Sequence, residues 1–263
     1  MTTSALKLLA LALMVVDHIG AYLPGTPLWL RYLGRCSAPL FLFCLAWGFH
    51  YTHSPKRYLL RLYLGGIATA LLDAALQILV PRDTAMMTSN IFPTLLLTGI
   101  LICLRQRPLS ECFFFFLWQC LDLLLLTWLV TQVGLPGCDA YTATVFYNAL
   151  FPSLIYTEGG VFVVLLGVGF DRLKQDPKAL SLGYLFYCLL AVLLTQPLIP
   201  KPLWLSQLVR FPDYQWMMVG ALPFLLLYNG KRWKTNRLFF YLFYPAHLCV
   251  LYLLGWAMEN FRI

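Results

Sequence analysis

Residues 5–23 read ALKLLALALMVVDHIGAYL, a run interrupted only by Lys7 and by the pair Asp17-His18 near its end. A helix needs about 20 mostly apolar residues to cross a bilayer. Apolar residues make up 60% of the 263-residue chain and charged residues 11%, where a soluble domain carries roughly 25%. The run therefore predicts a transmembrane helix, and the composition predicts an all-α, polytopic membrane protein.

Similar apolar runs recur along the rest of the chain, with no linker, low-complexity segment or internal repeat between them. We therefore expect one domain over residues 1–263. Lys7 is the only cation before the uninterrupted apolar stretch, and no small-residue cleavage site follows, so we expect this run to be retained and not removed as a signal peptide. About nine spans are predicted, at residues 5–23, 37–52, 57–80, 91–104, 110–133, 154–170, 180–199, 214–229 and 238–258.

The cations alternate between successive loops. Twelve of the nineteen Lys and Arg residues lie in alternate loops, and the intervening loops hold five. Cytoplasmic loops carry the excess of positive charge, so this pattern predicts a cytoplasmic N-terminus and an external C-terminus. Because the net charge of +8 is divided among short clusters, we expect a lipid bilayer as partner and no nucleic acid. The twelve are Lys56, Arg57, Arg61, Arg105, Arg107, Arg172, Lys174, Lys178, Lys231, Arg232, Lys234 and Arg237.

The eight cysteines lie mostly within apolar runs and form no C-x-x-C pair. Buried cysteines behave as small apolar residues in such surroundings. We therefore expect no metal site and no structural disulfide.

Ionisable side chains within spans are the first candidates for chemistry, because inserting them costs a few kcal/mol and they usually face the bundle interior. Lys7 and His18 are eleven residues apart, which is about three helical turns plus about 20°, so they share one face about 16 Å apart. They could line one channel. Alternatively, Lys7 extends to lipid phosphates while His18 caps the helix.

Two further groups of polar residues have two interpretations each. Arg35, between Gly34 and small residues, suits a carboxylate or phosphate, or forms an ordinary ion pair with Asp17. A donor-rich group at the predicted inner surface is either a positive flank or a site for an anionic ligand such as a coenzyme phosphate. This inner group comprises His50, Lys56, Arg57 and Arg61.

Other polar residues lie deeper in the predicted spans. Asp73 and Asp122 are either paired structural charges or parts of a polar core. Pro245 is expected to kink the last span and free a carbonyl near His247. A histidine at mid-span favours a functional role.

Several motifs resemble the TraX family, the conjugative-pilin N-acetylases and their relatives. The first is Met14-x-x-Asp17-His18-Ile19-Gly20, followed by Gly34-Arg35 with Pro39-Leu40-Phe41. Weaker matches follow in order at Asn90-Ile91-Phe92, around Gly159 after Glu158, and at Phe243-Tyr244-Pro245-Ala246-His247-Leu248. The chain is also similar to broader membrane acyltransferases with an Arg-x10-His pattern, with Lys7 in place of the Arg.

The resemblance implies a bacterial inner-membrane enzyme that transfers an acetyl group from acetyl-CoA to an amine or hydroxyl of a small acceptor, either a peptide N-terminus or a glycan or lipid. His18 is the expected base, with Asp17 as its orienting partner and His247 as the second catalytic candidate. Arg35 and Asn90 are expected to contact the oxyanion or the acceptor. The coenzyme phosphates are expected at Lys7, His50, Lys56, Arg57 and Arg61.

A rival hypothesis is a non-enzymatic transporter or immunity-type protein, in which the same polar residues form a substrate or proton path. Transporters often contain inverted repeats, and the sequence has none that we detect. Binding of coenzyme A from the cytoplasmic face would separate the two classes.

The charge alternation generates a topology prediction. A reporter fused after Arg107 should be cytoplasmic and one fused after Gly137 should be external, because the two positions flank the fifth predicted span. Protease protection or reporter activity in whole cells measures both, and finding the two reporters on one side would overturn the span assignment.

Overall fold

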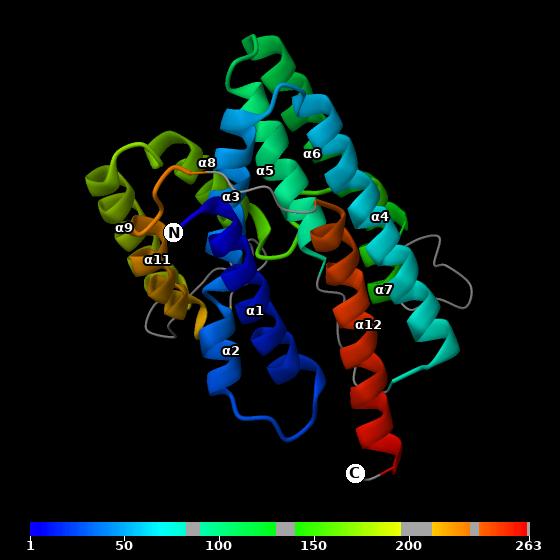
Figure 1. Cartoon of the computed structure of the whole chain (residues 1–263). Helices are drawn as coiled ribbons and strands as arrows, with labels where there is room; N and C mark the ends of the chain where they lie inside the picture. Colours follow the sequence, from blue (N-terminus) through cyan, green and yellow to red (C-terminus); the bar gives the residue numbers. More distant parts are fainter. Residues whose placement is uncertain (83–89, 130–139, 196–211, 232–236, 262–263) are drawn as a thin grey trace.

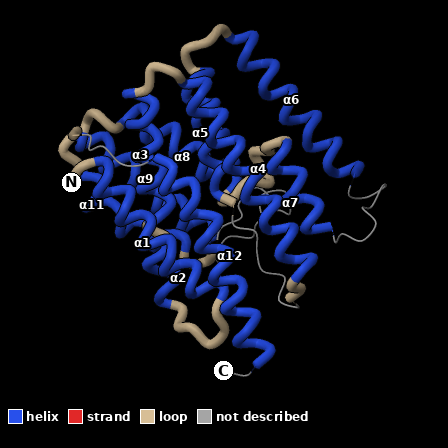
Figure 2. The backbone as a smooth tube through the Cα atoms, turned by 45° about the vertical axis from the view of Figure 1, so that its right-hand side comes forward, coloured by secondary structure: helices blue, strands red, loops and turns tan. Residues whose placement is uncertain are grey.

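The computed structural model describes residues 1–82, 90–129, 140–195, 212–231 and 237–261, and within these ranges every regular element is helical (Figures 1 and 2). The predicted all-α, polytopic class is thereby confirmed. The elements are α1 (Thr3–Tyr22), α2 (Trp29–Gly34), α3 (Ser37–Tyr51), α4 (Pro55–Leu79), α5 (Ile91–Leu104), α6 (Leu109–Trp128), α7 (Ala140–Leu150), α8 (Gly160–Leu173), α9 (Pro177–Thr195), the 3-10 helix η2 (Gln215–Ala221), α11 (Leu222–Leu226) and α12 (Arg237–Phe261).

Within the described residues, six helical segments are long and apolar enough to cross a membrane: α1, α2 with α3, α4, α6, α9 and α12. The other three predicted spans correspond to shorter helices. At 1.5 Å per residue, the 14 residues of α5 cover about 21 Å, less than the roughly 30 Å of hydrocarbon. The nine-span count and the N-terminal orientation stay predictions, and Gly137 lies outside the described residues. The sequence reading did not foresee α7.

Local signals explain where several helices begin. Thr2 caps α1, with its hydroxyl accepting from the Ala5 amide at 3.3 Å. Pro55 occupies the first turn of α4, where its missing N–H leaves no helical hydrogen bond unmade. Gly159 precedes α8 with φ of 73°, a left-handed conformation that favours glycine.

The helices that form the site run side by side in two opposite directions (Figure 1). α1, α4 and α12 point one way, and α3 and α5 point the other. α1 packs on α2, α3 and α12, and α4 packs on α5, α7 and α12. We call the end where α1, α4 and α12 begin the near end, and the end where they finish the far end.

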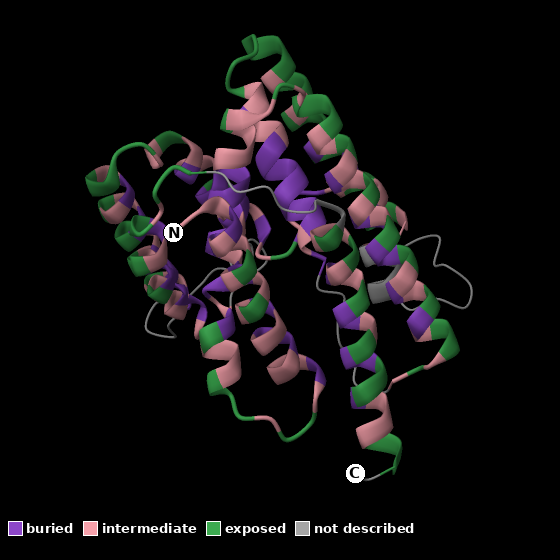
Figure 3. Cartoon of the chain, in the orientation of Figure 1, coloured by how far each residue is buried: buried purple, intermediate pink, exposed green. Residues whose placement is uncertain are grey.

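The buried residues gather in the middle of the molecule, on α3 and α5, while the outer helices carry exposed side chains (Figure 3). α6 exposes large apolar residues such as Phe113 and Leu124, as a lipid-facing helix should. Its buried residues are Gln119, Asp122 and Leu126. Asp122 accepts a hydrogen bond from the Tyr147 hydroxyl at 2.9 Å, which assigns this carboxylate to joining α6 with α7 and not to a pair with Asp73.

Two glycines two residues apart on α8 provide a matched test of this packing. A Cβ at Gly167 would meet Thr98 Cγ2 at 2.4 Å and Leu42 Cδ2 at 2.9 Å, whereas a Cβ at Gly169 would meet nothing within 4 Å. Gly167→Ala should lower the unfolding free energy by about 1–3 kcal/mol through overpacking. Gly169→Ala should leave stability unchanged or slightly higher. Thermal unfolding in one detergent compares them, and equal melting temperatures would contradict the packing.

Candidate functional site

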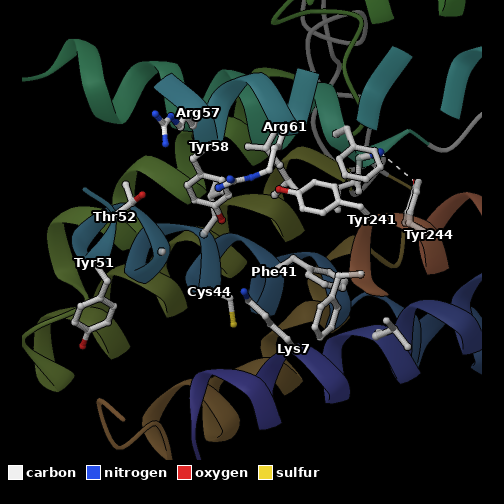
Figure 4. A pocket seen from close by; sticks show the side chains of 18 of the residues that line it. Lys7, Phe41, Cys44, Tyr51, Thr52, Arg57, Tyr58, Arg61, Tyr241 and Tyr244 are labelled. Carbon is white, nitrogen blue, oxygen red and sulfur yellow. Dashed lines mark hydrogen bonds between the residues drawn. The ribbon is translucent and has the colours of Figure 1, made fainter. Parts of the chain in front are cut away.

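A cavity of about 510 Å³ opens at the near end, between α1, α3, α4, α5 and α12. Lys7 from α1 faces Tyr58 and Arg61 from α4 across it, and Tyr241 and Tyr244 from α12 close its deeper side (Figure 4). The segment that follows α3 supplies Thr52, His53 and Ser54. The cavity is thus built from α1, α4 and α12, which begin at the near end, from α3, which finishes there, and from the first residues of α5.

Three cations line the cavity: Lys7, Arg57 and Arg61. The Lys7 ammonium lies 5.8 Å from the centre of the Phe240 ring, and the Arg61 guanidinium lies 5.8 Å from that of Tyr58. The Nε of Arg61 is buried and has no hydrogen-bond partner among the described residues. A cationic cavity with an unused donor is suited to an anion.

The structure separates the five residues predicted to contact coenzyme phosphates. Lys7, Arg57 and Arg61 come together in the cavity wall. His50 and Lys56 are exposed side chains outside that lining. The ring of His50 packs against Trp47 instead, with centroids 5.5 Å apart.

Two helix faces lead from the cavity towards the histidines. On α1 the lining residues Lys7, Leu11 and Met14 repeat at helical spacing, and His18 is next on that face. On α12 the lining residue Tyr244 is followed one turn later by His247. Both histidines are buried, with 4% and 8% of their surfaces exposed.

The two imidazoles meet directly. Nδ1 of His18 lies 2.8 Å from Nε2 of His247, and the rings stack with centroids 5.0 Å apart. Nδ1 of His247 lies 3.0 Å from the Phe243 carbonyl, and a carbonyl oxygen only accepts. In neutral His247 the proton therefore sits on Nδ1, so Nε2 accepts from His18. Neutral His18 then carries its proton on Nδ1 and a lone pair on Nε2.

Tyr244 connects the cavity with this histidine pair. Its ring lines the cavity and also makes edge contacts with His18 and His247, at centroid distances of 6.4 and 5.5 Å. Its hydroxyl accepts a hydrogen bond from the Ile91 amide at 3.2 Å. The tyrosine is thereby held between α5 and α12, beside both the cavity and the imidazoles.

Asp17 turns away from this pair to the start of the next helices. Its carboxylate forms ion pairs with Arg31, at 2.8 Å, and with Arg35. Of the two interpretations of Arg35, the structure contains the ion pair with Asp17. A Cβ on Gly34 would lie 2.1 Å from that of Asp17, so only glycine permits this approach. Two guanidinium groups thus share the Asp17 carboxylate, and Glu158 is a second carboxyl group that interacts electrostatically with both.

The side chain of Asn90 joins α5 to α4 through hydrogen bonds. Its Oδ1 accepts from the Phe92 amide at 3.2 Å, capping α5, and its Nδ2 donates to the Gly66 carbonyl at 2.9 Å. Pro245 lies inside α12 as predicted. The carbonyl that binds His247 is that of Phe243, however, and not the Tyr241 carbonyl that Pro245 leaves without its usual partner.

Some of these residues were not singled out from the sequence. Arg31 and Tyr244 lacked a pattern of their own, although Tyr244 precedes His247 by three positions, which is one helical turn. The contact between His18 and His247 joins residues 229 positions apart, and no local spacing signals it. Among the described residues, no group of three or more His, Cys, Asp or Glu is placed to hold a metal ion.

Comparisons with known proteins agree with the motifs quoted above. A family model described as "TraX protein" matches residues 2–255. The chain is also similar to a probable fimbrial assembly protein, FimC of serogroup H1, from Dichelobacter nodosus, with 24% identity over 257 residues, covering 94% of this chain and 92% of that protein. No solved structure matches the chain.

Proposed function

We propose that this chain, which belongs to the TraX family, is a membrane-bound acetyltransferase that moves an acetyl group from acetyl-CoA to an acceptor amine or hydroxyl. The observation that carries the proposal is one continuous arrangement: a cationic cavity whose walls on α1 and α12 lead to a buried, hydrogen-bonded histidine pair. Thioester acyl transfer needs both a binding site for an anionic coenzyme and a base for the acceptor proton.

The chemistry follows from the tautomers. Nε2 of His18 takes the proton of the acceptor N–H or O–H while the acceptor atom attacks the thioester carbonyl carbon. The new N–C or O–C bond forms, the C–S bond breaks, and the proton passes to the departing thiolate. His247 accepts from Nδ1–H of His18 and so keeps the Nε2 lone pair available. The guanidinium groups of Arg31 and Arg35 supply positive charge that favours the developing oxyanion.

The positive charge of the cavity places the proposed acetyl-CoA site at the near end. Lys7, Arg57 and Arg61 offer three cations to the phosphates of the coenzyme. The topology predicted from the sequence makes the near end cytoplasmic, which is where acetyl-CoA is supplied. A bacterial inner-membrane location accommodates both a cytoplasmic donor and an exported acceptor.

The acceptor class is supported by the relative alone. That protein is named for fimbrial assembly, so a pilin-like polypeptide is the first acceptor to test, before a glycan or lipid. Mass spectrometry of cell-envelope peptides and glycans, with and without the gene, should reveal one species that gains the mass of an acetyl group.

The histidine pair generates the central prediction. His18→Ala should lower kcat by about 10²- to 10⁴-fold, the usual contribution of a general base, while coenzyme A binding is retained. His247→Ala should lower kcat by at least about tenfold, because His18 then loses the hydrogen bond that keeps its proton on Nδ1 and its lone pair on Nε2. Acetyl transfer by purified protein in nanodiscs, with binding measured in parallel, tests both.

Other outcomes of the histidine experiment have distinct meanings. If His247→Ala abolishes turnover and His18→Ala loses less than about tenfold, His247 is the base. If neither variant changes turnover, the acyltransferase proposal fails. A chain that binds no coenzyme A and moves a solute instead would belong to the transporter class.

The cavity cations generate a second prediction. Arg57→Ala and Arg61→Ala should each raise KM for acetyl-CoA by about tenfold or more with little change in kcat, because a charge-assisted contact contributes about 1.5–3 kcal/mol. Arg172→Ala is the matched control, since Arg172 is an exposed arginine outside the cavity lining. Unchanged KM values in both cavity variants would place the coenzyme elsewhere.

A further inference from the structure

Arg82, just beyond α4 at the far end, contacts both helices that carry the histidine pair. Its Nη2 donates to the Tyr22 carbonyl at 3.2 Å, and Tyr22 is the last residue of α1. Its Nη1 donates to the Tyr252 carbonyl of α12 at 3.3 Å. Its Nε donates to the Glu259 carboxylate at 3.0 Å, and only 3% of its side chain is exposed. One guanidinium thus joins α1 and α12 through three separate groups.

The surrounding packing fits this arrangement. The Arg82 guanidinium lies 5.3 Å from the centre of the Tyr252 ring, and the Tyr252 hydroxyl donates to the Val80 carbonyl at 2.8 Å. A Cβ on Gly255 would meet the Tyr22 carbonyl oxygen at 2.3 Å and Arg82 Nη1 at 2.5 Å. The two helices therefore approach this closely only because α12 has a glycine here.

The location relates the contact to the histidines. Tyr22 lies four residues, or about 6 Å along α1, beyond His18, and Tyr252 lies five residues, about 7.5 Å along α12, beyond His247. The last carbonyls of a helix have no partner within it, so the Tyr22 carbonyl gains from an external donor. Fixing both backbones at this point limits how far one helix can slide along the other.

We propose that Arg82 is a positioning residue that holds α1 and α12 in the register that lets His18 and His247 form their hydrogen bond. The bridge to the two backbone carbonyls sets this register, and the ion pair with Glu259 orients the guanidinium. The effect on turnover rests on the proposed acetyltransferase function, whereas the effect on the histidine pair does not.

The first test measures the pair itself. The chain has only four histidines, so protein labelled with ¹⁵N-histidine and reconstituted in lipid should give a simple solid-state NMR spectrum. The wild type should show a ¹⁵N–¹⁵N correlation across the His18–His247 hydrogen bond, assigned by its loss in His18→Ala. Arg82→Gln should lose this correlation. Its persistence in Arg82→Gln, or its absence from the wild type, would overturn the proposal.

Three further variants separate register from general stability. Glu259→Gln removes the ion pair but leaves both carbonyl contacts, so it should keep the correlation. Losing it as fully as Arg82→Gln does would assign the effect to the ion pair and reject the bridge. Arg105→Gln breaks an ion pair with Asp171 between α5 and α8, and should also keep it. Gly255→Ala keeps Arg82 but places a Cβ against both the Tyr22 carbonyl oxygen and the Arg82 guanidinium, which forces the helices apart. It should lose the correlation even if Arg82→Gln fails to insert.

The second test measures turnover. Arg82→Gln should lower kcat for acetyl transfer by at least tenfold while the Kd for acetyl-CoA stays within twofold, because the cavity lies at the opposite end of the helices. A raised Kd with unchanged kcat would contradict positioning of the histidines. If the wild type transfers no acetyl group yet the NMR result holds, the proposed function fails and the positioning role stands.

Discussion

A polar group in the hydrocarbon region of a membrane is costly unless another group of the protein, or a ligand, forms a hydrogen bond with it. That constraint bears on the contacts around the site. The His18 imidazole is satisfied by His247, which is fixed in turn by the Phe243 carbonyl. Each such bond also ties together two helices, so the polar contacts that the membrane makes necessary set the relative positions of α1 and α12.

The same constraint separates two charged regions along the site. At the near end, Lys7, Arg57 and Arg61 surround open space, and their charge is available to a ligand. Beyond the histidines, Asp17 takes up part of the charge of Arg31 and Arg35. The histidine pair lies between an accessible cationic cavity and a largely internal ion cluster. An acyl donor and a developing oxyanion are the two anionic partners that these regions suit in the proposed reaction.

The sequence predicted best what depends on local periodicity. The apolar runs anticipated the long helices, and the eleven-residue spacing put Lys7 and His18 on one face of α1. Ion pairing of Arg35 with Asp17 was one of two interpretations, and choosing between them required knowing how α2 folds back on α1. The meeting of His18 and His247 depends on packing between the first and last helices, which spacing does not encode. α7 was missed because its sequence between two turn-rich segments has no long apolar run.

The helices α1 and α12 line the cavity and carry the two histidines. They are the first and last of the described helices. During synthesis α1 enters the membrane long before α12 is made. Throughout that interval the imidazole of His18 and the face of Lys7 lack the partners that satisfy them in the folded protein. A nascent chain therefore holds His18 without His247, and the proposed reaction, which uses both histidines, can begin only when α12 has been inserted and docked.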